Sequence, residues 1–236
     1  SDNTNDNPMF SGSPLHIPLD GYDPNGDPLT YTVSISGADA SKVSWEIIEG
    51  NRSLRMHVGT YGEMVFELFE GRAPRPAGRV IELAEDGFYE GIIFHRVIED
   101  FMIQGGDPTG TGSGGSTLGD FDDQFHVELQ HNRNGMMSYA KSGDDTNDSQ
   151  FFVTLEPTRF LDFNHSVFGI LVEGYEQLAS IGSIPTDGND KPTFDVDMSN
   201  VEVFTDTENA VLMLSAPEGT TGAVDVTVTA TDPSGN

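Results

Sequence analysis

Residues 94–107 read FHRVIEDFMIQGGD, and this stretch decides how the rest of the chain is interpreted. It continues an apolar run at 92–94 that is typical of a strand, and it ends in a glycine pair. Between these ends the sequence gathers a fixed cation, two soft apolar groups and an amide: Arg96, Phe101, Met102 and Gln104.

The spacing within this stretch predicts which side chains lie together. Side chains two positions apart share a face of an extended chain, so Met102 and Gln104 are expected to point the same way, as are Phe94 and Arg96. A guanidinium beside an apolar floor can hold an uncharged, partly hydrophobic group by hydrogen bonds. The stretch therefore predicts a binding site for such a group.

Three blocks of sequence together resemble the cyclophilins, which are peptidyl-prolyl cis/trans isomerases. They are FHRVIEDFMIQGGDPTGTGSGG at 94–115, MSYAKSG at 137–143 with TNDSQFFV at 146–153, and FLDFNHSVFG at 160–169. The resemblance covers residues 52–206 and implies a mainly β fold, a closed antiparallel β-barrel capped by two helices. It also implies that no cofactor is required for catalysis.

The pattern of residues 52–206 agrees with that fold. Alternating apolar residues predict strands at 53–58, 64–69 and 196–204. A helix is expected at 73–84, opened by prolines, and a second at 173–181.

The two ends of the chain have a different character. All eleven lysines and arginines lie between Lys42 and Lys191, so both ends are almost purely acidic. Their alternation predicts strands at 15–19, 29–35, 43–48, 210–214 and 224–230 and no helix. Each end has too few strands for a sandwich. We therefore expect one split β-sandwich from residues 1–51 and 207–236, resembling cadherin-like or immunoglobulin-like repeats. The alternative is that the two ends form separate β segments, each packed on the isomerase domain.

Composition limits the possible partners and compartments. The formal charge of −28 over 236 residues argues against nucleic acid as a partner. No run of about 18 apolar residues is present, so no membrane span is predicted. Ser1 is not a natural start, so we expect an excised fragment, and any export signal would lie outside it. The adhesion-like ends favour an extracellular, cell-surface or periplasmic location, and a monomer is expected.

The excess of acidic residues has two interpretations. It can serve solubility, as in a salty habitat, or it can serve calcium binding. Asn5, Asp6 and Asn7 are similar to the calcium linker of cadherins and are the candidate metal ligands. The Asp23–Pro28 stretch has alternating acidic residues but lacks the later residues of a calcium loop, so a turn is expected there.

Prolyl isomerisation needs little chemical machinery. Rotation about a peptide bond faces a barrier of about 18–20 kcal/mol, because the nitrogen lone pair is delocalised into the carbonyl. No bond breaks, so a catalyst need only grip the proline and favour the twisted state. By the resemblance, Arg96 is the catalytic cation and Gln104 positions it and binds the substrate backbone. Taken alone, Arg96 fits better with a surface ion pair to Glu99 or Asp100, and the two other matching blocks reverse that preference.

The resemblance also implies a set of substrate-binding residues. The proline pocket is formed by Phe101, Met102, Phe152, Leu161 and His165, although aromatic residues and Met are by themselves typical of a core. Gly112 lies in the loop that accommodates residues before the proline. The full set is Phe94, His95, Phe101, Met102, Gly112, Ala140, Lys141, Gln150, Phe152, Phe160, Leu161 and His165.

Two positions depart from the family pattern. Lys141 stands where the family usually has Asn, at a contact made through the backbone. Phe160 stands where many eukaryotic members have Trp, which contributes to cyclosporin binding, so weak cyclosporin binding is expected.

The sequence leaves two functions open. The first is an isomerase that acts on proline-containing peptides and on unfolded or exported proteins. The second is a calcium-stabilised surface adhesion or scaffold segment whose barrel only binds proline-containing peptides.

Overall fold

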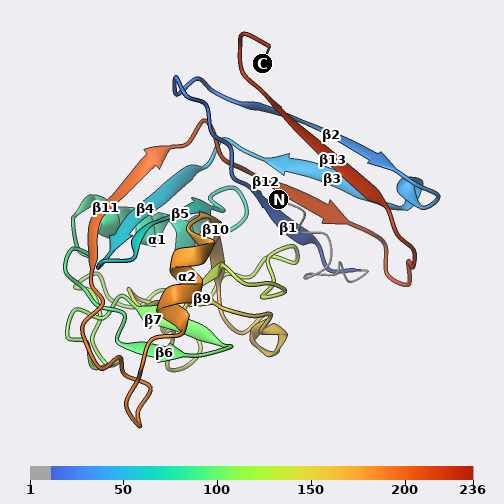
Figure 1. Ribbon diagram of the computed structural model, residues 1–236. Helices are drawn as coiled ribbons and strands as arrows, with labels where there is room; N and C mark the ends of the chain where they lie inside the picture. The colour runs from blue at the N-terminus through green and yellow to red at the C-terminus, as the bar shows by residue number, and fades with distance from the viewer. Residues whose placement is uncertain (1–11, 236) are drawn as a thin grey trace. The chain divides into compact units, whose positions relative to one another are not determined.

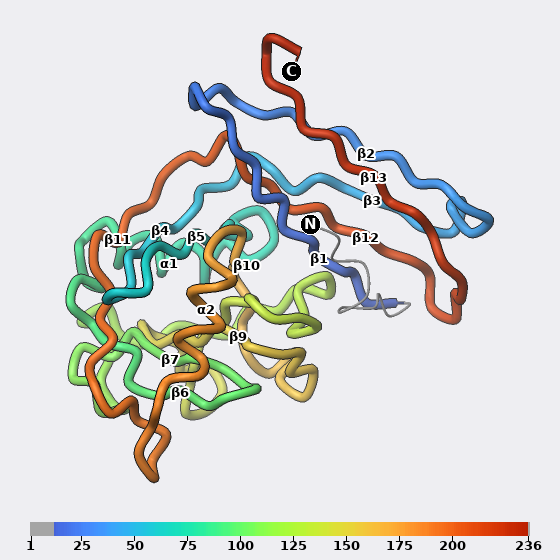
Figure 2. Tube along the Cα trace, in the orientation of Figure 1, coloured from blue at the N-terminus to red at the C-terminus, as the bar shows by residue number. Residues whose placement is uncertain are grey.

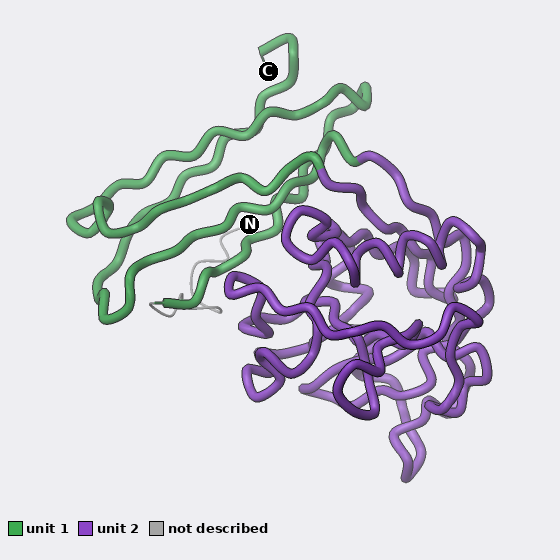
Figure 3. The backbone as a smooth tube through the Cα atoms, turned by 180° about the vertical axis from the view of Figure 1, so that it is seen from behind, with its two compact units in different colours: residues 1–50, 206–236 green, residues 51–205 purple. Residues whose placement is uncertain are grey.

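The computed structural model describes residues 12–235. The chain divides into two compact units, which are coloured separately in Figure 3. The larger unit is Asn51–Thr205, and the smaller unit combines the chain up to Gly50 with the chain from Asp206 onward.

The larger unit is built on one curled, antiparallel, eight-stranded sheet (Figure 1). Its strand order is β11-β4-β5-β10-β8-β9-β7-β6. The strands are β4 (Arg52–Val58), β5 (Gly62–Leu68), β6 (Arg96–Ile98), β7 (Met102–Gly105), β8 (Met136–Tyr139), β9 (Phe151–Thr154), β10 (Val167–Glu173) and β11 (Met198–Thr205). The strands predicted at 53–58, 64–69 and 196–204 are confirmed.

Full closure of the barrel is not confirmed. Within the described residues, β6 and β11 stand at the two ends of the strand order and share no ladder. The segments that precede them are joined by a single bridge between Ile93 and Asp197. The Phe94 amide also donates to the Val196 carbonyl at 2.9 Å. Residues 92–94, which the sequence predicted as part of a strand, are not one. The ladder of the β6–β7 hairpin begins only at Arg96.

The core of this unit is aromatic and aliphatic. Strands β8 and β9 are buried along their whole length, which suits a sheet that curls around its own inner face. The Phe151 ring meets those of Tyr89 and Phe94 edge-on, at centroid distances of 5.7 and 6.1 Å. Burying a side chain of this size contributes about 1.5–3 kcal/mol relative to exposure.

Two helices pack on the sheet, as predicted. Helix α1 (Pro74–Glu85) begins with proline, whose missing N–H is not needed in a first turn, and packs against β10 and β11. Helix α2 (Tyr175–Gly182) packs against β5, β6 and β7. A short 3₁₀ helix, η2 (Arg159–Leu161), lies between β9 and β10.

The smaller unit contains two sheets in its described part. One is β1-β12-β3 and the other pairs β13 with β2. All five predicted strands are present: β1 (Leu15–Leu19), β2 (Thr30–Ser36), β3 (Ser44–Ile48), β12 (Ala210–Ser215) and β13 (Asp225–Thr231). A 3₁₀ turn, η1 (Ala40–Lys42), was not expected. Each sheet contains strands from both ends of the chain.

The Asp23–Pro28 stretch is a turn, as expected. The Asp23 side chain accepts hydrogen bonds from the amides of Asn25 and Asp27 at 2.8 and 3.0 Å, which closes the turn on itself. The candidate calcium ligands Asn5, Asp6 and Asn7 lie outside the described residues. Over residues 12–235, no group of three or more His, Asp or Glu side chains is arranged to hold a metal ion. Neither helix in that range is long and apolar enough to cross a membrane.

We predict opposite effects of alanine at two glycines. Gly174 precedes α2 with φ of +98°, and an added Cβ would lie 2.6 Å from the Glu63 carbonyl oxygen. Gly174→Ala is therefore expected to lower the free energy of unfolding by about 2 kcal/mol or more. Gly78 lies within α1 with open space around it, so Gly78→Ala is expected to raise this free energy by up to about 1 kcal/mol. Urea unfolding of both variants tests the pair, and equal effects would contradict it.

Candidate active site

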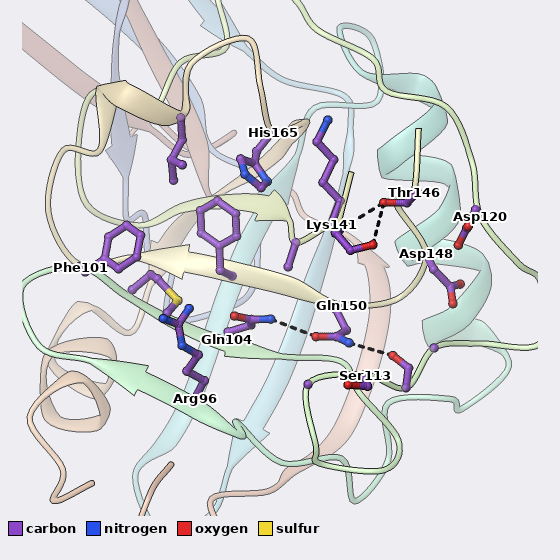
Figure 4. A pocket seen from close by; sticks show the side chains of 18 residues that line it. Arg96, Phe101, Gln104, Ser113, Asp120, Lys141, Thr146, Asp148, Gln150 and His165 are labelled. Carbon is purple, nitrogen blue, oxygen red and sulfur yellow. Dashed lines mark hydrogen bonds between the residues drawn. The ribbon is translucent and has the colours of Figure 1, made fainter. Parts of the chain in front are cut away.

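One cavity of about 640 Å³ opens on the curled sheet of the larger unit (Figure 4). It contains most of the residues that the sequence singled out. Those that line it are Arg96, Phe101, Met102, Gln104, Gly112, Ala140, Lys141, Gln150, Phe152, Leu161 and His165.

Strand register assembles the centre of this cavity. In the β6–β7 hairpin Arg96 lies directly opposite Gln104, and in the β7–β9 pair Gln104 lies opposite Phe152. Residues opposite one another in a sheet share a face, so these three form one row across three strands. Met102 lies two positions from Gln104 and also lines the cavity, which confirms their predicted common face.

The Arg96 guanidinium is partly exposed, at 41% of the side chain. One of its terminal nitrogens lies 3.4 Å from a carboxylate oxygen of Asp190. Asp190 has a positive φ of 63°, and its carbonyl accepts a hydrogen bond from the Val97 amide at 2.9 Å. The cation thus pairs with a residue of the segment between α2 and β11, which is the orange trace in Figure 2, and not with Glu99 or Asp100 as one interpretation of the sequence held.

Two glutamines join the strands to the glycine-rich loop. The Gln104 amide donates to the Gln150 side-chain oxygen at 3.0 Å, and the Gln150 amide donates to the Gly114 carbonyl at 2.8 Å (Figure 4). This chain fixes the orientation of Gln104 beside Arg96.

The other end of the cavity is apolar. Phe152 meets the His165 ring edge-on at 5.5 Å, with Phe101, Met102 and Leu161 around them. Nδ1 of His165 lies 2.9 Å from the Tyr139 carbonyl oxygen, and because a carbonyl only accepts, Nδ1 carries the proton. Burial lowers the pKa of His165 below 6.5, so the ring is neutral at neutral pH.

Asp107 holds the glycine-rich loop in shape. Its carboxylate accepts hydrogen bonds from the amides of Thr109, Thr111 and Gly112 at 2.7, 3.0 and 2.6 Å. Burial opposes the ionisation of Asp107, but these hydrogen bonds outweigh it and hold the pKa well below the usual value of 3.8. A side chain on Gly114 would collide with this carboxylate, so the loop needs glycine there.

Lys141 lines the cavity with its charge paired. Its side chain is 4% exposed, and the ammonium pairs with Asp123 and lies 3.5 Å from Asp144. The Ala140 amide donates to the Gln150 carbonyl at 2.9 Å. The charge of Lys141 is thus neutralised by neighbouring carboxylates.

Three predicted residues do not line the cavity. Phe94 is fully buried in the core, because residues 92–94 are not in a strand and so do not share the face of Arg96. His95 is also buried, at 5% exposure, and both of its ring nitrogens lack a hydrogen-bond partner. Phe160 is 74% exposed and lies outside, with its ring 5.7 Å from that of Phe101.

The cavity also contains residues that sequence reasoning missed. They are Asp120, Ser142, Thr146 and Asp148; Ser113, Gly114 and Gly115 also line the cavity and belong to the glycine-rich loop 110–115 that the resemblance places beside the pocket. Ser, Thr, Gly and Asp in loops are typical of turns, so composition gave no signal for them. Asp148 pairs with Arg79 at 3.2 Å, which fixes this wall to α1.

Comparison with known proteins agrees with this geometry. Residues 53–203 match the family described as "Cyclophilin type peptidyl-prolyl cis-trans isomerase/CLD". The chain belongs to the cyclophilin family. The match covers well over half of the chain and leaves out both terminal segments.

The relatives of this cyclophilin include named isomerases. It is 49% identical over 133 residues to "Peptidyl-prolyl cis-trans isomerase ppi1" of Schizosaccharomyces pombe, covering 56% of this chain and 86% of that protein. It is 45% identical over 137 residues to "Peptidyl-prolyl cis-trans isomerase-like 1" of Mus musculus, covering 57% and 82%. A crystal structure of a cyclophilin type peptidyl-prolyl cis-trans isomerase of Cryptosporidium parvum matches with a TM-score of 0.63 and 35% identity, covering 68% of this chain and 99% of that one.

We predict that the stability of this cyclophilin falls on mild acidification through His95. Burial lowers the pKa of His95 in the folded state below the unfolded value of 6.5. As the pH falls through 6.5 the unfolded chain binds a proton that the folded chain resists, so the free energy of unfolding decreases by at most about 1.4 kcal/mol per pH unit.

Urea unfolding between pH 7.5 and 5.5 measures this slope. His95→Gln removes the titrating ring, and its slope is expected to be shallower. The same slope in both proteins would contradict a role for His95.

Proposed function

We propose that Arg96 carries X–Pro isomerisation in this chain by stabilising the twisted amide. When the bond rotates, the prolyl nitrogen loses conjugation and becomes basic. A guanidinium is a permanent cation with fixed donors, so it binds this nitrogen better in the twisted state than in either planar state. The observation that carries the proposal is the row of Arg96, Gln104 and Phe152, which places the cation beside an apolar pocket.

The apolar end of the cavity suits a proline ring. Phe101, Met102, Phe152, Leu161 and the neutral ring of His165 line one continuous cavity with Arg96. Gripping the ring there leaves the preceding carbonyl free to rotate. No acid, base or nucleophile is needed for this reaction, and His165 forms part of the wall.

The remaining cavity suits the peptide before the proline. Gly112 to Gly115 and Gln150 line this part of the cavity, and the Gln150 amide donates to the Gly114 carbonyl. The Cryptosporidium relative was solved "in the presence of dipeptide ala-pro", which supports proline peptides as ligands here. The alternative of an adhesion segment that only binds peptides has no support from the comparisons.

Replacement of Arg96 tests this mechanism. Arg96→Ala is expected to lower kcat/KM by about 100-fold or more, because one pre-positioned donor to developing charge is worth that much. Arg96→Lys keeps the charge but loses the planar fork, so only partial activity is expected. NMR exchange spectroscopy on an Ala-Pro peptide measures the rate without a coupled protease.

Gln124 offers a control for this experiment, since it lies outside the cavity lining and its side chain accepts from the Arg75 amide. Gln124→Ala is expected to leave exchange unchanged. Full activity in Arg96→Ala would exclude the proposed mechanism.

Cyclosporin is expected to bind weakly, because Phe160 lacks an indole N–H donor. Phe160 is exposed beside Phe101, so a larger ring can be placed there without disturbing the core. Phe160→Trp is expected to tighten cyclosporin binding about three- to tenfold, the usual value of one hydrogen bond. Titration calorimetry of both proteins measures this, and a tight complex with the unchanged chain would overturn the expectation.

The smaller unit supports a wider proposal. Because both of its sheets combine strands from the two chain ends, we propose that residues 1–51 and 207–236 form one split, cadherin-like or immunoglobulin-like domain with the cyclophilin domain, residues 52–206, inserted into it. On this basis we also propose a monomer at the cell surface, outside the cell or in the periplasm that acts on exported proteins. A closed barrel, supported by the Ile93–Asp197 bridge, belongs to the same proposal. Calcium at Asn5, Asp6 and Asn7 rests on their sequence alone.

A further inference from the structure

The turn at Phe163 combines strain with exposure. Phe163 has φ of +57°, a conformation that is unfavourable for a bulky side chain. The residue is nevertheless 53% exposed, so burial does not offset the strain. Of the residues from 12 to 235, the other non-glycine residues with positive φ are Asp or Asn, which tolerate it.

Hydrogen bonds hold the residues on both sides of Phe163. On one side, the Asp162 carboxylate accepts from the His131 amide at 2.6 Å. On the other side, the His165 amide donates to the Leu161 carbonyl at 3.1 Å, and its ring is fixed to Tyr139. Backbone strain that the surroundings over-determine in this way is typical of ligand-binding sites.

The position of the turn connects it with the cavity. Phe163 lies two residues from both Leu161 and His165, which line the apolar end. Phe160, which precedes the turn, is exposed and lies with its ring 5.7 Å from that of Phe101, another lining residue. Two exposed phenylalanines therefore flank, along the chain, the residues that line the apolar end of the cavity.

The turn presents little charge beside these rings. The Asp162 side chain is only 10% exposed, with one oxygen directed to His131 and the other 3.6 Å from Arg159. A surface that keeps its carboxylate paired and its phenylalanine exposed suits an apolar ligand group.

We propose that Phe163, together with Phe160, binds a large apolar side chain that follows the proline of the substrate. This inference rests on the proposed function, in which the residues before the proline lie along Gly112–Gly115. The residues after the proline then leave the cavity at the opposite, apolar end. Contact with an aromatic side chain adds affinity beyond that of the proline itself.

Two peptides that differ only after the proline test this. Dissociation constants of Ala-Ala-Pro-Phe and Ala-Ala-Pro-Ser amides are measured by NMR titration, and exchange rates are measured on the same samples. The unchanged chain is expected to favour the Phe peptide, and Phe163→Gly to reduce that preference about three- to tenfold. Phe163→Gly is also expected to melt at a higher temperature, because glycine adopts positive φ without strain.

Asn200→Gly provides the matched control. Asn200 is exposed in β11 with φ of +47°, so glycine relieves the same kind of strain far along the chain from the turn. It is expected to raise the melting temperature and to leave the peptide preference unchanged. A third peptide, Ala-Phe-Pro-Ser amide, is expected to show no dependence on Phe163.

The outcomes separate the two proposals. The role of Phe163 is overturned if Phe163→Gly prefers the Pro-Phe peptide over the Pro-Ser peptide as strongly as the unchanged chain does. It is also overturned if Phe163→Gly loses as much affinity for Ala-Phe-Pro-Ser amide as for Ala-Ala-Pro-Phe amide. Peptide binding without accelerated exchange overturns the isomerase mechanism, and the ratio of dissociation constants still decides the role of Phe163. If neither peptide binds, both proposals fail.

Discussion

The cross-strand register of β6, β7 and β9 is the constraint on which the site depends. A shift of one residue in either pairing would turn Gln104 to the other face of the sheet and separate it from Arg96 or Phe152. The buried residues between them, Val97, Ile103 and Val153, oppose such a shift, because it would expose them. The packing of the core thus fixes the position of a partly exposed cation.

Most charged side chains in and around this cavity are held by ion pairs or hydrogen bonds, so they have a structural role. Lys141 and Asp148 are each paired, with Asp123 and Arg79, and the carboxylate of Asp107 is held by backbone amides. Paired charges of this kind shape walls and loops, whereas an unpaired one would bind solvent or ions. Arg96 differs, because its ion pair with Asp190 is long and solvent-exposed, so the cation can exchange partners at low cost.

Sequence reasoning predicted the local structure well and the long-range contacts poorly. Alternation identified the five strands of the smaller unit's described part but only β4, β5 and β11 of the larger unit, and proline identified the start of α1. The shared face of Met102 and Gln104 followed from period-two geometry. The same rule was wrong for Phe94, because the backbone leaves the extended ladder before Arg96. The contact between Arg96 and Asp190 spans 94 positions, and no local pattern encodes a contact of that separation. Phe163 was missed because a backbone angle, not a residue type, distinguishes it.

The pairing of β4 with β11 has a consequence for the order of folding. Arg52 lies opposite Thr205, so the larger unit brings its own first and last residues together when it folds. The smaller unit must pair Thr30 with Thr231, which in an unfolded chain closes a very long loop. The entropic cost of closure grows with the logarithm of loop length, by about 0.6 kcal/mol for each doubling. Once the larger unit is folded, it holds the ends of the two terminal segments close together, so the loop that their strands must close is effectively short. During synthesis, the first fifty residues must therefore wait for the last thirty, with the catalytic unit already complete between them.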